Sequence, residues 1–201
     1  MGGQVRAESR RLYDFRFADR WFVGKGLDVC CGDDPIRPWL WPRITALGLY
    51  DIQLGSKDAL TLQEVEDASF DFIHSSHGFE HMVDLDIALE NWLRVIRPGG
   101  FIVMLVPEEL LYECGNWPSK FNEDHKYAFT LRQKPVISTA TNLLRFLNSK
   151  PVDVELISLL TTYWNSNAFG YDQTLIRGGP ECSIEVVLRK PIPSSDIKDL
   201  I

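Results

Sequence analysis

The sequence contains no apolar run long enough to cross a bilayer, and residues 1–11 are polar and basic. A membrane-spanning helix needs roughly 20 mostly apolar residues, and a secretory signal needs an apolar core. We therefore expect neither a membrane anchor nor a signal peptide, no membrane partner, and a cytoplasmic location.

Positive charge is scarce, with 21 Lys and Arg against 28 Asp and Glu and a formal net charge of −7. Sequence-independent binding to a nucleic-acid phosphate backbone depends on clustered Lys and Arg, so we expect no nucleic-acid partner. One locally basic segment opens the chain, and solvated helix-face arginines explain it better than an anionic substrate does. Its members are Arg6, Arg10, Arg11, Arg16 and Arg20.

Metal-site spacings are also lacking. The four cysteines, Cys30, Cys31, Cys114 and Cys182, show neither C-x-x-C pairs nor histidines in zinc-site order. Reduced thiols that pack as small hydrophobic groups are the better interpretation. The loosely spaced carboxylates Glu108, Glu109, Glu113 and Asp124 are typical of solvated side chains, so we expect no metal.

What remains is an ordinary globular composition, with 45% apolar and 24% charged residues and no internal repeat. A chain of 201 residues is long enough for one well-buried domain and too short for two ordinary ones. We expect a single domain over residues 1–190, followed by a C-terminal tail, 191–201.

Short apolar segments alternate with amphipathic ones along the chain. The clearest helix is 85–96, where Leu85, Leu89 and Trp92 share one face, with Asp84 as N-cap and a stop at Arg97-Pro98-Gly99-Gly100. This alternation, closed by two strands, predicts a mostly parallel sheet with helices on both faces. The predicted strands are 27–31, 46–50, 70–74, 101–106, 152–160 and 182–189, and the other predicted helices are 8–22, ended by Gly24-Lys25-Gly26, and 138–148.

In such sheets ligands bind beyond the carboxyl ends of the strands. Gly32 follows the first predicted strand, and Asp51 follows the second, 19 positions later (51 − 32). A glycine turn with a carboxylate at the next strand end is the usual arrangement for a ribose-bearing nucleotide, because the carboxylate accepts hydrogen bonds from ribose hydroxyls. The pattern therefore predicts a nucleotide-type cofactor.

The acidic turn decides between cofactors. A dinucleotide site wants G-x-G-x-x-G after the strand, but the only G-x-G here, Gly24 to Gly26, precedes it. Asp33 and Asp34 would repel a pyrophosphate and would tolerate a ligand that carries a sulfonium and an ammonium group. We therefore expect S-adenosylmethionine rather than NAD.

Three blocks in order resemble class I S-adenosylmethionine-dependent methyltransferases of the type 11 group. Residues 27–32 (LDVCCG) resemble the first motif, 69–81 (SFDFIHSSHGFEH) the fourth-strand block, and 92–100 (WLRVIRPGG) the signature before the fifth strand. The resemblance implies a Rossmann-like α/β fold with an antiparallel last strand. It also implies a cofactor site at Asp28, Cys30, Gly32, Asp51, Asp58, Ala59, Leu60, Ser75 and Ser76.

By this resemblance, Asp28 and Gly32 shape the part of the site that binds the methionine end of the cofactor. Asp51 binds the ribose, and Asp58 contacts the adenine amino group. The sequence departs from the family at Cys30, where a glycine is usual, and at Asp34. Only seven positions (58 − 51) separate Asp51 from Asp58, so the helix that normally lies there is missing or reduced to a turn.

Histidines are the candidate catalytic groups, because methyl transfer to a hydroxyl benefits from a general base. His77 follows the strand that faces the methyl group, and His125 lies in a loop insertion, 108–135, that is expected to cover the substrate. Asp124 is a candidate to orient His125, although adjacent residues rarely face each other. His81 more simply caps the loop that enters the helix, and His74 is an ordinary strand residue.

The expected activity is O- or N-methylation of a small molecule or a sugar or glycan. The glycan option rests on similarity to a subgroup with a shortened second unit and segments like 117–122 and 124–126. Two alternatives stay open: a non-catalytic module of the same fold, and a nucleotide-dependent oxidoreductase. The sequence does not determine the oligomeric state, and a homodimer stays an open option.

Overall fold

The chain folds around one six-stranded sheet with the strand order β2-β1-β3-β4-β8-β7. The computed structural model describes residues 3–55, 58–175 and 180–194. β8 is antiparallel to both β4 and β7, whereas β2, β1, β3 and β4 pair in parallel. The strands are β1 (Gly24–Val29), β2 (Ile44–Tyr50), β3 (Phe70–Ser76), β4 (Ile96–Pro107), β7 (Asp153–Leu160) and β8 (Ser183–Arg189).

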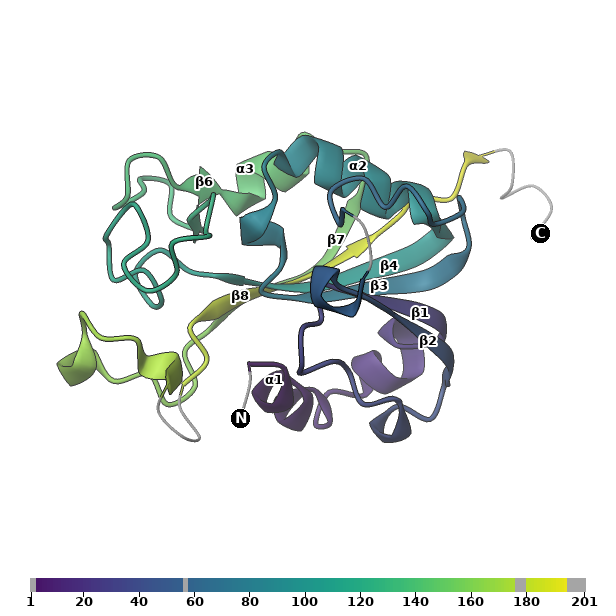
Figure 1. The fold of residues 1–201 in the computed structure, drawn as a ribbon, viewed down its shortest axis with the longest axis horizontal. Coiled ribbons are helices and arrows are strands. Elements are labelled where there is room, and N and C mark those ends of the chain that lie inside the picture. The colour runs from purple at the N-terminus through teal and green to yellow at the C-terminus, as the bar shows by residue number, and fades with distance from the viewer. Residues whose placement is uncertain (1–2, 56–57, 176–179, 195–201) are drawn as a thin grey trace.

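This topology confirms the predicted mostly parallel sheet with an antiparallel last strand. The helices α2 (Leu85–Val95) and α3 (Leu143–Asn148) cover one face, while α1 (Gly3–Arg11) and a π-helical segment (Phe17–Trp21) lie across the other (Figure 1). Short 3-10 turns occupy several connections: Pro38–Leu40, Ile52–Leu54, Phe79–His81, Ser166–Ala168 and Gln173–Leu175.

Each face of the sheet has its own core. Beneath α2, Trp92 and Phe79 join a large aliphatic cluster, and their rings lie 5.3 Å apart. On the opposite face, aromatic residues dominate, and Phe22 contacts both Trp41 and Phe72. Burying large aromatic side chains is the main stabilising contribution of such clusters.

The helix α2 forms as its periodicity predicts. The carboxylate of Asp84 accepts hydrogen bonds from the backbone amides of Asp86 and Ile87, at 2.9 and 3.0 Å, which satisfies two of the amides left open at a helix start. Leu85, Leu89 and Trp92 are buried on its inner face. The chain then enters β4 directly, with Gly99 in the left-handed region at φ 80°.

The expected single helix over 8–22 is wrong. Helix α1 ends at Arg11, and a separate π-helical segment begins at Phe17. Asp14 separates them, because its carboxylate accepts hydrogen bonds from the backbone amide and the guanidinium of Arg16. The apolar period also misled, since Phe15, one of the residues expected on the buried face, is 74% exposed.

Two further boundaries differ from expectation. Gly24-Lys25-Gly26 is expected to break the chain before the first strand, but these residues form the start of β1. Glycine is needed at position 26 because a Cβ there would lie 2.1 Å from the Phe72 ring. The helix predicted over 138–148 shortens to α3, preceded by the small parallel pair β5 (Phe129–Thr130) and β6 (Thr141–Asn142). The expected C-terminal tail lies largely outside the described residues, in 195–201.

No α-helix connects β2 to β3 among the described residues, which confirms the shortened second unit. Side chains from α2 hold this connection instead. The indole of Trp92 donates to the Ala59 carbonyl at 2.9 Å, and the Arg94 guanidinium donates to the carbonyls of Thr61, Leu62 and Val65. The loop thus gains from α2 the backbone partners that a helix would supply internally.

A buried polar chain ties α1 to the sheet. Arg11 is fully buried; it donates to Glu185 on β8 at 2.7 Å and to Nε2 of His74 on β3 at 3.1 Å. A guanidinium can only donate, so His74 accepts at Nε2 and carries its proton on Nδ1, which lies 2.6 Å from Asp28. The prediction that His74 is an ordinary strand residue is wrong, because it links two charged groups.

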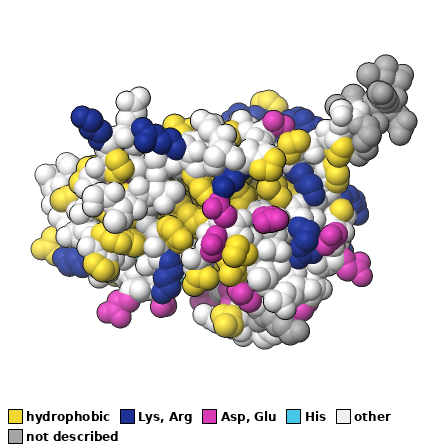
Figure 2. Space-filling view, turned by 90° about the horizontal axis from the view of Figure 1, so that it is seen from above, with side chains coloured by type: hydrophobic (Ala, Val, Ile, Leu, Met, Phe, Trp, Pro, Cys, Tyr) yellow, Lys and Arg dark blue, Asp and Glu magenta, His cyan; other side chains and the backbone are white. Residues whose placement is uncertain are grey.

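None of the described helices is both long and apolar enough to span a membrane. On the face that α2 and α3 cover, acidic, basic and apolar side chains are interspersed (Figure 2). A phosphate backbone is instead bound by an extended basic surface, which the described side chains of this face do not form.

We expect Glu185→Gln to lower the free energy of unfolding by about 3–5 kcal/mol, because the buried guanidinium of Arg11 loses its anionic partner and the half-buried Arg10 keeps only Glu181. Burial raises the pKa of Glu185, but the two arginines outweigh it, so its pKa lies below the ordinary 4.5. The stability from this ionised carboxylate is complete above about pH 4.5 and is lost as the pH falls below it.

Urea unfolding at several pH values measures how the free energy of unfolding depends on pH. The wild type should lose more stability below pH 4.5 than Glu185→Gln does. Glu90→Gln, on the exposed face of α2, is the matched control and should track the wild type. Equal pH slopes for the wild type and Glu185→Gln would contradict the assignment.

Candidate active site

The turn after β1 and the end of β2 form a joined pair. The Asp51 carboxylate accepts from the Gly32 amide at 2.9 Å and from the Gln53 amide at 2.8 Å. Gly32 is in the left-handed region at φ 51°, and a Cβ there would meet no atom within 4 Å. The structure therefore leaves open space beside a glycine turn and a carboxylate, as a ribose-bearing ligand requires.

Cys30 takes over the conformation of the glycine it replaces. Its φ of 57° is left-handed, and Gly78 packs so closely that a Cβ there would lie 2.5 Å from the Cys30 Cβ. Burial, together with the nearby charge of Glu80, raises the pKa of the Cys30 thiol to about 12. The turn thus keeps its path with an inert, neutral thiol.

A cavity of about 200 Å³ opens at this edge of the sheet. Asp33 and Asp34 contribute carboxylates, and the N-terminal part of α1 contacts it, since the Val5 amide donates to Asp34. An anionic cavity suits a cationic ligand. Its lining residues are Gln4, Asp28, Cys31, Asp33, Asp34, His74, Ser76 and His77.

Asp28 shapes this cavity through its neighbours. One carboxylate oxygen accepts from the Ile36 amide at 2.7 Å, and the other faces Nδ1 of His74. Both oxygens are therefore engaged in fixing the turn. Of the two serines, Ser76 lines the cavity, whereas Ser75 is fully buried and its hydroxyl has no hydrogen-bond partner among the described residues.

The expected adenine loop is ordered locally. The Asp58 carboxylate accepts from the Leu60 amide at 2.8 Å, closing a turn. Ala59 and Leu60 pack against the core beneath α2. Asp58 and its two neighbours are thus held as one unit against the core beneath α2.

His77 leaves β3 in the left-handed region, at φ 57°. Its Nδ1 lies 3.4 Å from a carboxylate oxygen of Glu80, and its Nε2 lies 3.2 Å from the Ser183 hydroxyl. About a third of the side chain is exposed, at 31%. The ring is therefore positioned from both sides while staying accessible at the cavity.

His125 comes to the same place from the insertion. Its Nδ1 lies 2.7 Å from Glu113, and its Nε2 lies 3.9 Å from the Glu80 oxygen that faces His77. The carboxylate that orients His125 is thus Glu113 and not the adjacent Asp124, whose backbone carbonyl faces His81 instead. His125 is therefore oriented by a residue that the fold brings close to it, and not by its neighbour in the sequence.

The sequence analysis missed Glu80 and Glu113 as site residues. Glu80 stands three positions after His77, a spacing that brings side chains together on a helical turn such as Phe79–His81. No comparable signal pointed to Glu113. The grouping of Glu113 with Glu108 and Glu109 fails, because Glu108 binds Arg132 and the Leu110 amide, whereas Glu109 binds backbone amides at 136 and 137.

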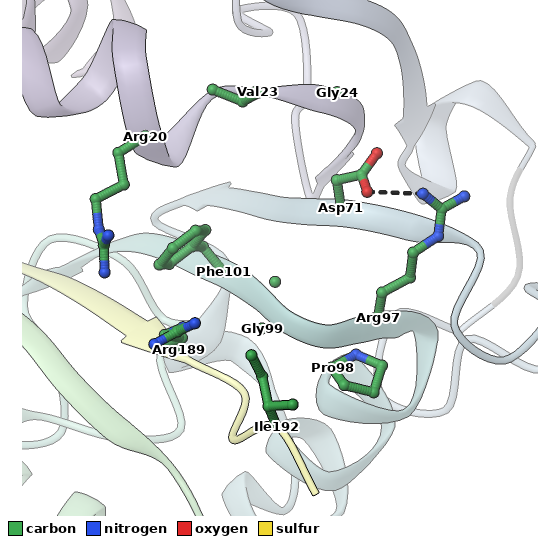
Figure 3. A pocket seen from close by; sticks show the side chains of 11 residues that line it. Arg20, Val23, Gly24, Asp71, Arg97, Pro98, Gly99, Phe101, Arg189 and Ile192 are labelled. Atoms are coloured by element: carbon green, nitrogen blue, oxygen red, sulfur yellow. Dashed lines mark hydrogen bonds and ion pairs between the residues drawn. The ribbon is translucent and has the colours of Figure 1, made fainter. Parts of the chain in front are cut away.

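A larger cavity, of about 460 Å³, lies at the opposite end of the strands. Figure 3 shows Arg20 and Arg189 on one side of it and Arg97, paired with Asp71, on the other. It borders Gly24, the first residue of β1. Because ligands of such sheets bind at the carboxyl ends, this cavity is not the cofactor site.

Known proteins share sequence and fold with this chain. Residues 27–104 match the family described as "Methyltransferase domain". The demethylmenaquinone methyltransferase of Staphylococcus haemolyticus is 30% identical over 105 residues, which cover 40% of this chain and 42% of that protein. The match thus spans less than half of the relative's length.

Solved structures resemble nearly the whole chain. A candidate methyltransferase from Bacillus halodurans aligns with a TM-score of 0.61 at 13% identity, covering 92% of this chain and all of that one. The N-methyltransferase NodS from Bradyrhizobium japonicum aligns with a TM-score of 0.57 at 14% identity, covering 96% of this chain and all of that one. These likenesses show the fold.

The fold, the matched segment and the order of the three sequence blocks agree with one another. Residues 27–104 thus match a methyltransferase domain family, and the chain shares its fold with solved S-adenosylmethionine-dependent methyltransferases.

Proposed function

We propose that this chain transfers a methyl group from S-adenosylmethionine to a hydroxyl or amine of a small molecule or sugar. The observation that carries the proposal is the anionic cavity at the carboxyl ends of β1 and β3, beside the open Gly32–Asp51 turn. The demethylmenaquinone and NodS relatives are named as methyltransferases, which supports the reaction type.

The residues present fit this cofactor. The space next to Gly32 would admit a ribose beside Asp51, and the turn Asp58–Leu60 would border the adenine. Asp33 and Asp34 give the cavity the negative charge that favours an ammonium and a sulfonium. A dinucleotide pyrophosphate would meet the same carboxylates unfavourably, which weighs against an oxidoreductase.

In this proposal the chain mainly orients the acceptor and receives its proton. When bound, S-adenosylmethionine supplies a methyl group already activated by its sulfonium. Transfer to the acceptor heteroatom would break the carbon–sulfur bond and leave its electron pair on the departing sulfur. His77 receives the acceptor proton at Nε2, because Nδ1 faces the Glu80 carboxylate at 3.4 Å.

A non-catalytic role is the alternative. Cys30 in place of the usual glycine would favour it if the turn had collapsed. The left-handed Cys30 and the open space at Gly32 instead leave the turn in a ligand-accepting shape. His77 also stays accessible beside it. These observations favour a working transferase.

Asp51→Asn tests the cofactor site. Losing the charge at Asp51 should weaken S-adenosylhomocysteine binding by about 1.5–3 kcal/mol, which corresponds to roughly 10- to 150-fold in Kd. Asparagine retains a side-chain oxygen that can accept from the Gly32 amide. Calorimetric titration measures the change.

Asp153→Asn, an exposed residue at the start of β7, is the control and should bind like the wild type. NAD should bind to neither protein. If the folded wild type shows no affinity for S-adenosylmethionine or S-adenosylhomocysteine, the proposed function is wrong.

His77→Gln tests the proton acceptor. Turnover should fall by roughly 10²- to 10⁴-fold, the usual contribution of a positioned base. The readout is S-adenosylhomocysteine release during incubation with panels of sugars, phenols and amines. S-adenosylhomocysteine binding should change little, because Nε2 faces Ser183 rather than the Gly32 turn. Unchanged turnover with a hydroxyl acceptor would remove His77 from the chemistry.

A further inference from the structure

Glu80 places a carboxyl group in the interior without hydrogen bonds to hold it from the part of the chain that the structure describes. Its side chain is fully buried on the turn Phe79–His81, and neither carboxylate oxygen has a hydrogen-bond partner among the described residues. Such a group is costly unless a cation or a proton neutralises it. Two imidazoles lie close to it, His77 at 3.4 Å and His125 at 3.9 Å.

His125 is arranged as a ligand with a fixed tautomer. Its Nδ1 faces Glu113 at 2.7 Å, where the carboxylate can only accept, so Nδ1 carries the proton. The lone pair of neutral His125 is therefore on Nε2, the nitrogen that faces Glu80. A carboxylate behind a histidine is the usual outer support of a metal ligand.

The Nδ1 atom of His81 also faces a hydrogen-bond acceptor, as that of His125 does. It lies 3.2 Å from the backbone carbonyl of Asp124, which accepts a hydrogen bond from the Nδ1–H group, so the ring lone pair is on Nε2. The rings of His81 and His125 meet edge to face with their centroids 5.0 Å apart. One ligand atom from each of Glu80, His81 and His125 lies within 4.8 Å of the others.

We propose that Glu80, His81 and His125 bind a divalent transition-metal ion, with Zn²⁺ as the best match. The ion would neutralise the buried Glu80 carboxylate, and Glu113 would support the His125 ligand. Two imidazoles and one carboxylate form a set typical of zinc sites that keep an open position. Mg²⁺ fits poorly, because it prefers oxygen ligands.

The sequence analysis expected no metal, since it grouped the acidic residues by their spacing. The proposed set joins two residues of one short turn, Glu80 and His81, to His125 more than forty positions away. The open position would take a water or an acceptor oxygen near His77. That role rests on the proposed function, whereas binding of the ion does not.

Equilibrium dialysis of the full chain against Zn²⁺, followed by metal analysis, tests the site. The wild type should retain one Zn²⁺ per chain at this cluster, and Glu80→Gln and His125→Gln should lose it. Glu113→Gln should raise the Kd roughly 10- to 100-fold, as removal of an outer support does. Asp124→Asn, which removes a charge but no ligand atom, should bind like the wild type.

Circular dichroism checks that every variant folds, and His81→Gln supplies a third ligand variant at a partly exposed position. S-adenosylhomocysteine titrations on the same samples separate the metal site from the proposed cofactor site. A folded wild type that binds no Zn²⁺ would overturn the proposal. So would folded Glu80→Gln and His125→Gln proteins that bind Zn²⁺ as tightly as the wild type, because a protonated imidazole would then neutralise Glu80.

Discussion

The buried ion pair between Arg11 and Glu185 is the contact on which the arrangement of this protein depends. It joins the end of α1 to the antiparallel strand β8, and His74 extends it to Asp28 on β1. Taking a guanidinium out of water costs several kcal/mol unless its donors are satisfied. The first helix therefore has one low-energy position on the sheet, beside the turn after β1.

That position determines the candidate cofactor cavity. Asp28 holds the Ile36 amide with one oxygen and His74 with the other, so the buried network fixes the path of the turn that contains Gly32. The Val5 amide on α1 binds Asp34 at the same cavity. Stability and ligand binding are thus coupled through shared side chains rather than through distant effects.

Side chains of α2 take the place of a helix that is missing from the described residues between β2 and β3. Where the fold usually places a helix between β2 and β3, the described chain has only turns, and Trp92 and Arg94 of α2 satisfy the loop's carbonyls. The loop bearing Asp58 is consequently anchored to the core beneath α2. This anchoring explains how a chain of 201 residues keeps an ordered site without that helix.

The sequence by itself determined the sheet class, α2 with its Asp84 cap, and the carboxyl-end positions of Gly32 and Asp51. Hydrophobic period, capping and strand–turn order are local properties, so they can be deduced without knowing the neighbours. Local patterns failed at residues 8–22, where the apolar period included the exposed Phe15.

Only the tertiary structure decided the partners of the polar side chains. Glu113 faces His125 and His74 bridges Asp28 to Arg11, and these contacts join residues 12, 46 and 63 positions apart. No periodicity encodes such pairs, because they depend on how separate elements pack. The gathering of His77, Glu80 and His125 likewise arises when the insertion after β4 folds back over the end of β3, which a linear pattern does not record.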